Sequence, residues 1–286
     1  MAANENPAKG ANTMKRKNPS PKTPLIALLT DFGSSDWFAA SMKAVIKQIL
    51  PNAEIIDITH NVEPHNILAA SFILESCYRD FPEGAIFCCV VDPGVGSKRK
   101  RLAATDGTYF FLAPDNGLLT SVEARSEIWL MYSIINKELR HQGPGATFEA
   151  RDVFAPAAAH LASGVKIDSL GPLYKDMKRL DLWHPKKEGK NSLTALMIYI
   201  DRFGNLVTNI APDDLPSSCD PARIVVAIKK RKIKGIHKSY SDVKPGQTVL
   251  YWGSTGRLEI GVNLGNAASL FTIGYGDKIS LYYQNS

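Results

Sequence analysis

The sequence has no apolar run that approaches the roughly 20 residues needed to cross a bilayer. Its first residues also lack the apolar core of a secretory signal. We therefore expect a cytoplasmic protein without a membrane partner. Cysteine is scarce, with four residues in a chain of 286. The spacing of these cysteines fits no metal site, so we expect reduced, mostly buried thiols and no metal.

Aromatic residues are missing from the basic stretches of the chain. The net charge is +6 and the pI is near 9.0, a balance that can indicate a polyanionic partner. The three basic runs lie at 15–17, 98–101 and 229–234. A surface that stacks nucleic-acid bases needs aromatic side chains among its cations. We therefore expect each run to be a solvated face, and we expect no nucleic-acid partner.

The N-terminal half alternates between strand and helix patterns. Residues 1–23 are rich in Asn, Pro, Lys and Ala without a hydrophobic period, which predicts a disordered leader. The alternation then predicts an α/β domain over 24–185 with a mostly parallel sheet. A hairpin is expected at 101–112, with its turn at Asp106-Gly107. The expected strands are 25–29, 54–58 and 85–91, and the expected helices are 38–50, about 66–78 and about 153–162.

The pattern changes after a polar stretch at 171–191. Beyond it, apolar and polar residues alternate between turns that contain Gly, Pro and Asp. The alternation predicts a small all-β domain over 192–286, an antiparallel barrel or sandwich. The expected strands are 193–200, 206–210, 223–228, 247–252, 258–262 and 278–283.

Two apolar strands end in an acid and a glycine, at Asp31 and Asp92. The carboxyl ends of parallel strands meet at the edge of a sheet where ligands bind, so both acids are candidate site residues. Asp31 is suited to accept hydrogen bonds from both hydroxyls of a ribose, or else it caps the helix that begins near Asp36. Arg99 follows Asp92 by seven residues, and a Pro-Gly turn would fold its guanidinium onto the carboxylate. Such a pair is either functional or purely structural.

Other polar loop residues are weaker candidates. Asp152 precedes a helix, where an acid is ordinarily a dipole partner. Asp201 and Asn205 lie in a segment whose first interpretation is a hairpin turn. None of the six histidines has the spacing of metal ligands.

Seven segments together resemble one family, the S-adenosylmethionine hydrolases (hydroxide adenosyltransferases), which are similar to the fluorinases and chlorinases. Each segment alone is weak evidence, but their order and spacing across both domains make the resemblance specific. The segments are LTDFG at 29–33, DITH at 57–60, VVDPGVG at 90–96, PDNGL at 114–118, RD at 151–152, DRFGN at 201–205 and GNAA at 265–268.

The resemblance implies an N-terminal α/β domain, a C-terminal β domain and a homotrimer. Each active site would lie between the N-terminal domain of one subunit and the C-terminal domain of the next. S-adenosylmethionine would be the substrate and adenosine a product, so no cofactor is implied. Asp31 would hold the ribose diol, with His65 beside the ribose or the methionine chain. In the C-terminal domain, the resemblance assigns Asp201 to the methionine amino group, Ser254 to its carboxylate, and Asn205 with Asn266 to Ala268 to the adenine.

Water activation in the hydrolases that this chain resembles involves an Asp, an Arg and a His. Asp92 and Arg99 match the first two. The family pattern Thr-Phe-His-Gly-Arg-Asp is TFEARD at 147–152 in this chain, so that Glu149 replaces the His. We expect Glu149 to accept a hydrogen bond from water, with reduced or altered activity. Two carboxylates around Arg99 are also expected to push the pKa of one of them upward, toward a base useful near neutral pH.

Three activities are compatible with these residues. Hydrolysis by in-line attack of water on the ribose 5′ carbon gives adenosine and methionine, which leaves as a neutral thioether. Halide transfer is disfavoured, because an added carboxylate repels a halide by about 4 kcal/mol at 4 Å and an effective dielectric of 20. A binding protein without turnover would explain Glu149 as decay of the site, but retention of Asp92 and Arg99 argues against it.

Overall fold

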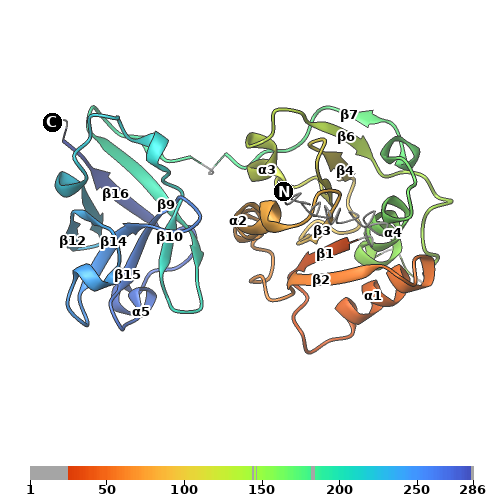
Figure 1. Ribbon diagram of the computed structural model, residues 1–286, viewed down its shortest axis with the longest axis horizontal. Helices are drawn as coiled ribbons and strands as arrows, with labels where there is room; N and C mark the ends of the chain where they lie inside the picture. The colour runs from red at the N-terminus through yellow and green to blue at the C-terminus, as the bar shows by residue number, and fades with distance from the viewer. Residues whose placement is uncertain (1–24, 144, 146, 182–183, 285–286) are drawn as a thin grey trace, which may run out of the picture.

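The computed structural model describes residues 25–143, 145, 147–181 and 184–284. Two sheets form the centres of two domains (Figure 1). The leader predicted at 1–23 lies outside the described residues. Among the helices of the described part of the chain, none has the length and apolar character required to span a membrane.

The N-terminal sheet is mixed, not mostly parallel as predicted. Its strand order is β2-β1-β3-β5-β4-β6-β7. The pairs among β2, β1, β3 and β5 are parallel, and every pair beyond β5 is antiparallel. The strands are β1 (Leu25–Thr30), β2 (Glu54–Thr59), β3 (Ile86–Val90), β4 (Arg101–Thr105), β5 (Phe110–Pro114), β6 (Leu130–Ser133) and β7 (Leu173–Tyr174).

The hairpin between β4 and β5 is the reason for the mixed sheet. The carboxylate of Asp106 accepts hydrogen bonds from the backbone N–H groups of Thr108 and Tyr109, at 2.9 and 2.7 Å, and Gly107 has a φ of +89°. These contacts reverse the chain within a few residues. The sequence predicted the hairpin, but not that β5 pairs with β3 and that β4 continues the same sheet toward β6.

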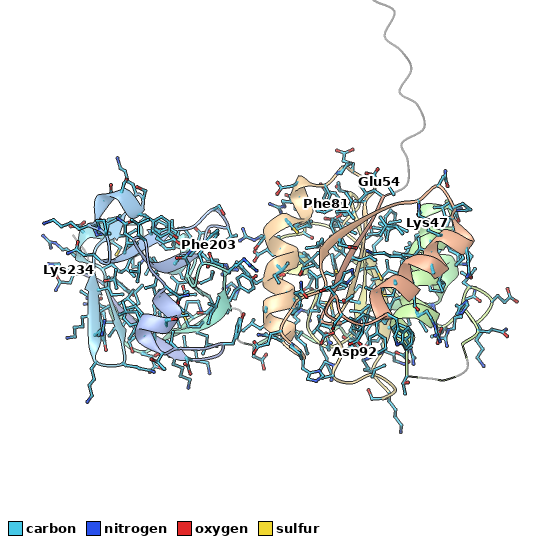
Figure 2. The ribbon with its side chains drawn as sticks, turned by 90° about the horizontal axis from the view of Figure 1, so that it is seen from below. Lys47, Glu54, Phe81, Asp92, Phe203 and Lys234 are labelled. Atoms are coloured by element: carbon cyan, nitrogen blue, oxygen red, sulfur yellow. The ribbon has the colours of Figure 1, made fainter. Side chains whose placement is uncertain are left out.

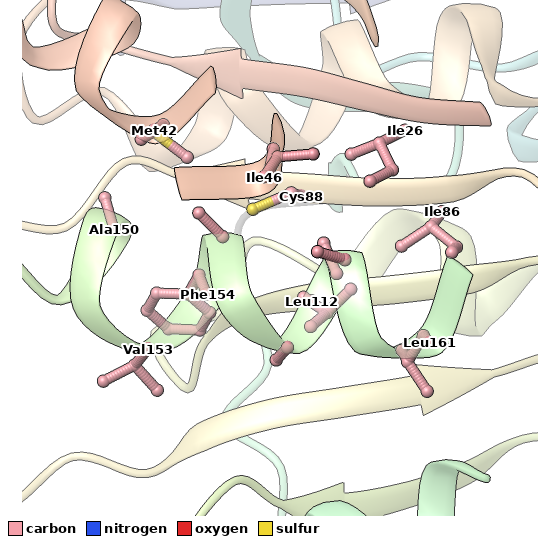
Figure 3. Close-up of a cluster of buried hydrophobic side chains, with 14 of the residues drawn as sticks. Ile26, Met42, Ile46, Ile86, Cys88, Leu112, Ala150, Val153, Phe154 and Leu161 are labelled. Carbon is pink, nitrogen blue, oxygen red and sulfur yellow. The ribbon is translucent and has the colours of Figure 1, made fainter. Parts of the chain in front are cut away.

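Helices cover both faces of this sheet. α1 (Phe38–Ile49) and α4 (Ala155–Ala162) pack on one face, and α2 (Ile67–Cys77) and α3 (Thr120–Ala124) on the other. Because β1 and β3 are covered on both sides, their residues are continuously apolar. Figure 3 shows Ile26, Ile86 and Cys88 among the side chains that fill the layer under α1 and α4. β1, β3, α1 and α4 are therefore anchored in a buried core.

The C-terminal domain is a strongly curved, nearly closed sheet in the order β12-β11-β16-β9-β10-β15-β14-β13, with β8 also pairing with β9. All pairs are antiparallel except β13 with β14. The six strands expected from the sequence are present, and the charged run at 229–234 contains a further edge strand. The elements are β8 (Lys186–Lys187), β9 (Ser192–Ile200), β10 (Leu206–Thr208), β11 (Val225–Ile228), β12 (Arg231–Lys234), β13 (Ile236–His237), β14 (Thr248–Trp252), β15 (Leu258–Val262), α5 (Ala267–Phe271) and β16 (Lys278–Tyr282).

Helix α2 connects the two domains. Phe72 from α2 packs with Ile198 and Val207 from β9 and β10 in a small buried cluster. Beside this cluster, the buried guanidinium of Arg257 contacts Glu75 Oε2 through its Nη2 atom at 3.3 Å. An apolar contact and a buried ion pair thus join α2 to the C-terminal sheet.

Candidate active site

A cavity of about 540 Å³ lies at the carboxyl ends of β1 and β3. Loops that are far apart in the sequence line it, as expected where parallel strands end at one edge of a sheet. Four of the predicted site residues belong to this lining, namely Asp31, His65, Asp92 and Glu149. The predicted residues of the N-terminal domain are therefore brought together.

Asp31 does not cap the helix that follows it. α1 begins at Phe38, and its N-terminus carries no side-chain cap. Instead, Asp31 Oδ2 accepts a hydrogen bond from the backbone N–H of His65 at 2.9 Å. His65 has a φ of +67°, an unfavourable conformation for a residue with a side chain. Asp31 thus stabilises the loop that presents His65, and its Oδ1 accepts no hydrogen bond from the described residues.

The predicted pair between Asp92 and Arg99 is present. Arg99 Nε donates to Asp92 Oδ1 at 2.7 Å, and Arg99 Nη2 donates to Asp92 Oδ2. Both side chains are only 5% exposed. The backbone N–H of Gly94 also donates to Asp92 Oδ1, at 3.2 Å, so that the Pro-Gly turn helps to orient the carboxylate. The pair is bidentate and buried, a geometry that fixes both groups.

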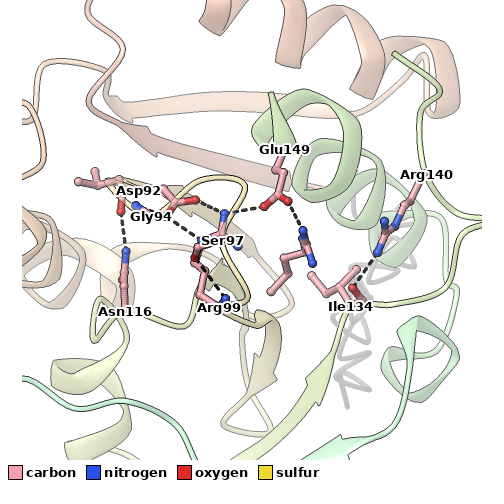
Figure 4. A network of polar contacts seen from close by, with 10 residues as sticks. Asp92, Gly94, Ser97, Arg99, Asn116, Ile134, Arg140 and Glu149 are labelled. Atoms are coloured by element: carbon pink, nitrogen blue, oxygen red, sulfur yellow. Dashed lines mark hydrogen bonds and ion pairs between the residues drawn. The ribbon is translucent and has the colours of Figure 1, made fainter. Parts of the chain in front are cut away.

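Glu149 extends this pair into a longer ion network (Figure 4). Arg99 Nη2 donates to Glu149 Oε2 at 2.5 Å, and Arg101 Nη2 donates to Glu149 Oε1. Glu149 begins a π-helical turn over Ala150–Phe154 that leads into α4, and its side chain is 7% exposed. The network thus runs from Asp92 through Arg99 and Glu149 to Arg101.

The pKa of Glu149 corrects one prediction. Burial by itself raises this pKa, but the hydrogen bonds from Arg101 and Arg99 outweigh burial and hold it below its ordinary value. The prediction that one of the two carboxylates around Arg99 has a raised pKa therefore does not hold for Glu149. The reason is Arg101, a second cation that the sequence interpretation did not place beside Glu149.

Arg101 is the main site residue that sequence reasoning missed. It was assigned to the basic run at 98–101, expected to be a solvated face. In the structure Lys98 and Lys100 are exposed, whereas Arg99 and Arg101 turn inward to the two carboxylates. The signal was the spacing, because residues two apart in an extended chain point to the same side.

Aromatic side chains form one wall of the cavity. Phe148 lies edge-on to Trp37 and Phe38, with ring centroids 5.5 and 5.2 Å apart, and Phe32 packs beside them at 6.0 Å from Phe148. Trp37 remains 56% exposed. This wall was not predicted from the sequence, because the rings come from segments more than 100 residues apart. The rings line the same cavity as Asp31, Asp92 and Glu149, an environment that suits an organic cation, although the guanidinium of Arg151 already lies over the Phe148 ring at 5.0 Å.

The predicted residues of the C-terminal domain lie around a second cavity of about 1060 Å³, which Asp201, Asn205 and Ser254 line together with residues of α2. Asp201 Oδ1 accepts from the backbone N–H groups of Phe203 and Asn205 at 2.9 and 2.8 Å. Its Oδ2 accepts from Asn205 Nδ2 at 2.7 Å. Asp201 thus stabilises the predicted turn after β9, and Phe203 at its tip is 75% exposed on the side toward the N-terminal domain (Figure 2).

The turn after β9 is locked to the segment that begins α5. Asn266 Oδ1 accepts from the backbone N–H of Ser269 at 2.8 Å and caps α5, while Ala268 N donates to Gly204 O at 2.9 Å. Neither Asn266 nor Ala268 lines the second cavity directly. They instead support the loops that line it.

Gly204 is required at this contact. Its φ is +83°, and an added Cβ would lie 2.2 Å from the side chain of Asn266. We expect Gly204→Ala to lower the free energy of unfolding by at least about 1 kcal/mol, because of backbone strain and the clash. Thermal and urea unfolding measure the effect. Gly274→Ala is the matched control, since Gly274 has no neighbour within 4 Å and no positive φ. Equal stability of the two variants would contradict the prediction.

A hydrogen-bonded chain in the second cavity was also missed. Tyr240 and Tyr251 join their hydroxyls at 2.5 Å, and Tyr251 donates to Glu259 Oε2 at 2.6 Å. Burial, together with the charge of Asp201, raises the pKa of Glu259, although the bond from Tyr251 opposes the change. The two cavities have no lining residue in common. Within one chain, the predicted site residues therefore form two separate groups, one at each cavity.

Comparison with known proteins identifies the family of both domains. The chain matches the model of the SAM hydroxide adenosyltransferase N-terminal domain over residues 26–171 and that of the C-terminal domain over residues 195–280. A conserved protein from Thermotoga maritima has a similar crystal structure, with a TM-score of 0.82 and 38% identity over 90% of this chain and 99% of the other.

Named relatives fall into two activities. The (R)-S-adenosyl-L-methionine hydrolase of Salinispora tropica is 32% identical over 262 residues, which cover 90% of this chain and 97% of the relative. A fluorinase of an Actinoplanes species is 28% identical over 223 residues, which cover 69% and 75%. With both domain models matched in order and a hydrolase matched over nearly its full length, the chain belongs to the SAM hydroxide adenosyltransferase family.

Proposed function

We propose that this chain hydrolyses S-adenosylmethionine to adenosine and methionine by attack of water on the ribose 5′ carbon. The observation that carries the proposal is the buried network of Asp92, Arg99 and Glu149 at the wall of a cavity that also contains Asp31. The hydrolase relatives are named for the (R) form of the substrate. We extend that preference to this chain.

The proposed substrate fits the N-terminal cavity by charge and shape. Asp31 has one carboxylate oxygen without a partner among the described residues and accepts hydrogen bonds from the ribose hydroxyls, with His65 beside them. The wall of Trp37 and Phe148 lies against the sulfonium, whose positive charge is attracted by π faces and by the nearby carboxylates.

The second half of the proposed site comes from a neighbouring subunit of a homotrimer. The separation of the two cavities within one chain supports this arrangement, because neither cavity alone holds groups for the ribose, the amino acid and the adenine together. Asp201 and Ser254 bind the amino and carboxylate groups of methionine, respectively. Asn205, with the segment from Asn266 to Ala268, lies beside the adenine.

The proposed reaction balances as a single displacement. The water oxygen forms a bond to the 5′ carbon, the bond from this carbon to sulfur breaks, and its electron pair remains on sulfur in neutral methionine. The attacking oxygen becomes strongly acidic as the bond forms, so a carboxylate with a low pKa is sufficient to accept its proton. Glu149, whose pKa is lowered, is such an acceptor, and the carboxylate of Asp92 in the same cavity is a second one. Positioning of water and exclusion of bulk solvent then supply most of the acceleration.

The two alternative activities gain no specific support. Glu149 is part of a charge-balanced network with a dedicated partner in Arg101, which is not the arrangement expected of a decayed site. The same balance weakens the predicted repulsion of a halide. The product therefore distinguishes the two nucleophiles, because water gives adenosine and a halide gives a 5′-halogenated adenosine.

Turnover in oxygen-18 water tests the proposed function. We expect adenosine that carries one labelled oxygen at its 5′ position and methionine without label, because the new bond joins water to carbon. Mass spectrometry of both products measures this, with separated (R) and (S) substrates. Added chloride should yield no 5′-chloro product, and Asp92→Asn serves as the impaired control. Release of no adenosine between about pH 6 and 9 would refute the proposal.

A further inference from the structure

Arg101 is a fourth charged residue of the network, and the Asp, Arg and His of the resembled hydrolases assign no role to it. Its Nη2 contacts Glu149 Oε1, while Arg99 Nη2 contacts the other oxygen, Oε2. Each oxygen of one carboxylate is therefore held by a different guanidinium. A carboxylate with a single partner can rotate about its terminal torsion, which is broad, whereas one held at both oxygens cannot.

We propose that Arg101 is a positioning residue that acts through Glu149, holding its carboxylate against Arg99 as a fixed acceptor at the cavity. The inference rests on the proposed function for its effect on turnover. Its structural content is independent of that function, because it concerns which cation fixes Glu149.

Charge balance supports this role. A histidine at position 149 would be neutral near pH 7, so Glu149 adds one negative charge beside Asp92. Arg101 adds one positive charge. The network then contains two carboxylates and two guanidiniums, all buried or half-buried. Removing one partner of a buried ion pair leaves an uncompensated charge, so Glu149 and Arg101 depend on each other.

The surroundings of Glu149 define the expected titration. The two guanidiniums lower its pKa against the effect of burial, and loss of Arg101 should raise that pKa. A group with a lowered pKa stabilises the fold at pH values above its unfolded pKa, and this stabilisation is lost as the pH falls through the folded pKa. The charged and titratable groups around the site are Asp31 after β1, His65 before α2, Asp92 after β3, Arg99 before β4, Arg101 in β4, and Arg140.

The first experiment titrates Glu149 directly. Carbon-13 NMR of protein labelled at glutamate carboxyls gives its pKa, with the resonance assigned by its loss in Glu149→Gln. We expect Arg101→Ala to raise this pKa by about one unit or more, and Arg101→Lys to restore part of the shift. Lys100→Ala is the matched control. Lys100 is exposed and next to Arg101 in the sequence, and its replacement by alanine removes the same charge. An unchanged pKa in Arg101→Ala overturns the proposal, whatever the turnover.

The second experiment is a kinetic double-mutant cycle. We expect Arg101→Ala to lower kcat about 10-fold with KM changed by less than about twofold, because a catalytic acceptor is misplaced while the substrate contacts remain. The acid limb of kcat, which follows the lowered pKa of Glu149 in the unaltered protein, should move to higher pH. In the Glu149→His background the same change should cost less than about twofold, since the charge that Arg101 balances is gone.

The two experiments separate the two proposals. Equal losses in both backgrounds would show a merely structural role and overturn the inference about Arg101. If the unaltered protein forms no adenosine, the proposed function fails, and the NMR titration still decides whether Arg101 fixes Glu149.

Discussion

Replacing Arg99 with alanine should lower the free energy of unfolding by about 3–5 kcal/mol, the cost of breaking a buried ion pair, and should abolish turnover. Arg99 donates to both Asp92 and Glu149, and all three side chains are nearly inaccessible. Without it, two buried carboxylates remain with Arg101 alone to balance them. Urea unfolding followed by circular dichroism measures the stability, and adenosine release measures the activity.

Two controls test whether the loss of stability in Arg99→Ala comes from the buried ion network. Lys98→Ala removes the same charge from an exposed position of the same loop and should change stability by less than about 0.5 kcal/mol. Adding Asp92→Asn and Glu149→Gln to Arg99→Ala should restore much of the stability but no activity, because neutral amides do not repel each other. If Arg99→Ala unfolds at the same urea concentration as the unaltered protein, the network contributes nothing to folding.

Asp31→Ala should lower kcat/KM about 100-fold or more while leaving the protein folded. The proposed bonds from the ribose hydroxyls are charge-assisted, and each contributes about 1.5–3 kcal/mol. The substitution also removes the acceptor for the His65 N–H, so some loss of order in that loop is expected. Calorimetry with adenosine and 2′-deoxyadenosine isolates the ribose contact, because the unaltered protein should prefer adenosine and Asp31→Ala should not.

Asp31→Asn is the matched variant for this position. It keeps an acceptor for the His65 N–H but has no charge to offer the ribose, so it should preserve the loop and still lose most of the preference for adenosine. If Asp31→Ala and the unaltered protein discriminate equally between the two nucleosides, Asp31 acts only on the loop. The assignment to the ribose would then be wrong.

The sequence predicted the elements well where local patterns decide them. The continuous apolar runs of β1 and β3 indicated strands covered on both faces, and both are buried in the structure. The hairpin at Asp106 gave the direction of β4 relative to β5, but the pairing of β5 with β3 and of β4 with β6 was not predictable in this way, because it depends on which neighbours the hairpin finds in the sheet. Hydrophobic period identifies a strand without identifying its partner.

The residues of the candidate site were predicted, but the charges around Glu149 were not. The strand ends and the Pro-Gly turn indicated Asp31, Asp92 and Arg99, the resemblance supplied their roles, and the structure places them at one edge of the sheet or beside it. The predicted rise in the pKa of one carboxylate does not occur at Glu149, because electrostatics depends on every charge within several ångströms and Arg101 had been counted as surface. Contacts across 48 residues of sequence are not visible in local composition.

The joint between α2 and the C-terminal sheet has a consequence for how substrate enters and products leave. The packing of Phe72 on the C-terminal sheet and the buried Glu75–Arg257 pair join the two domains of one chain and disfavour a hinge between them. In the proposed reaction, we therefore expect the movements that admit substrate to occur in small elements, such as the half-exposed Trp37 and the Phe203 turn. Side-chain and loop movements, and not a rotation of whole domains, are then expected to control access to the site.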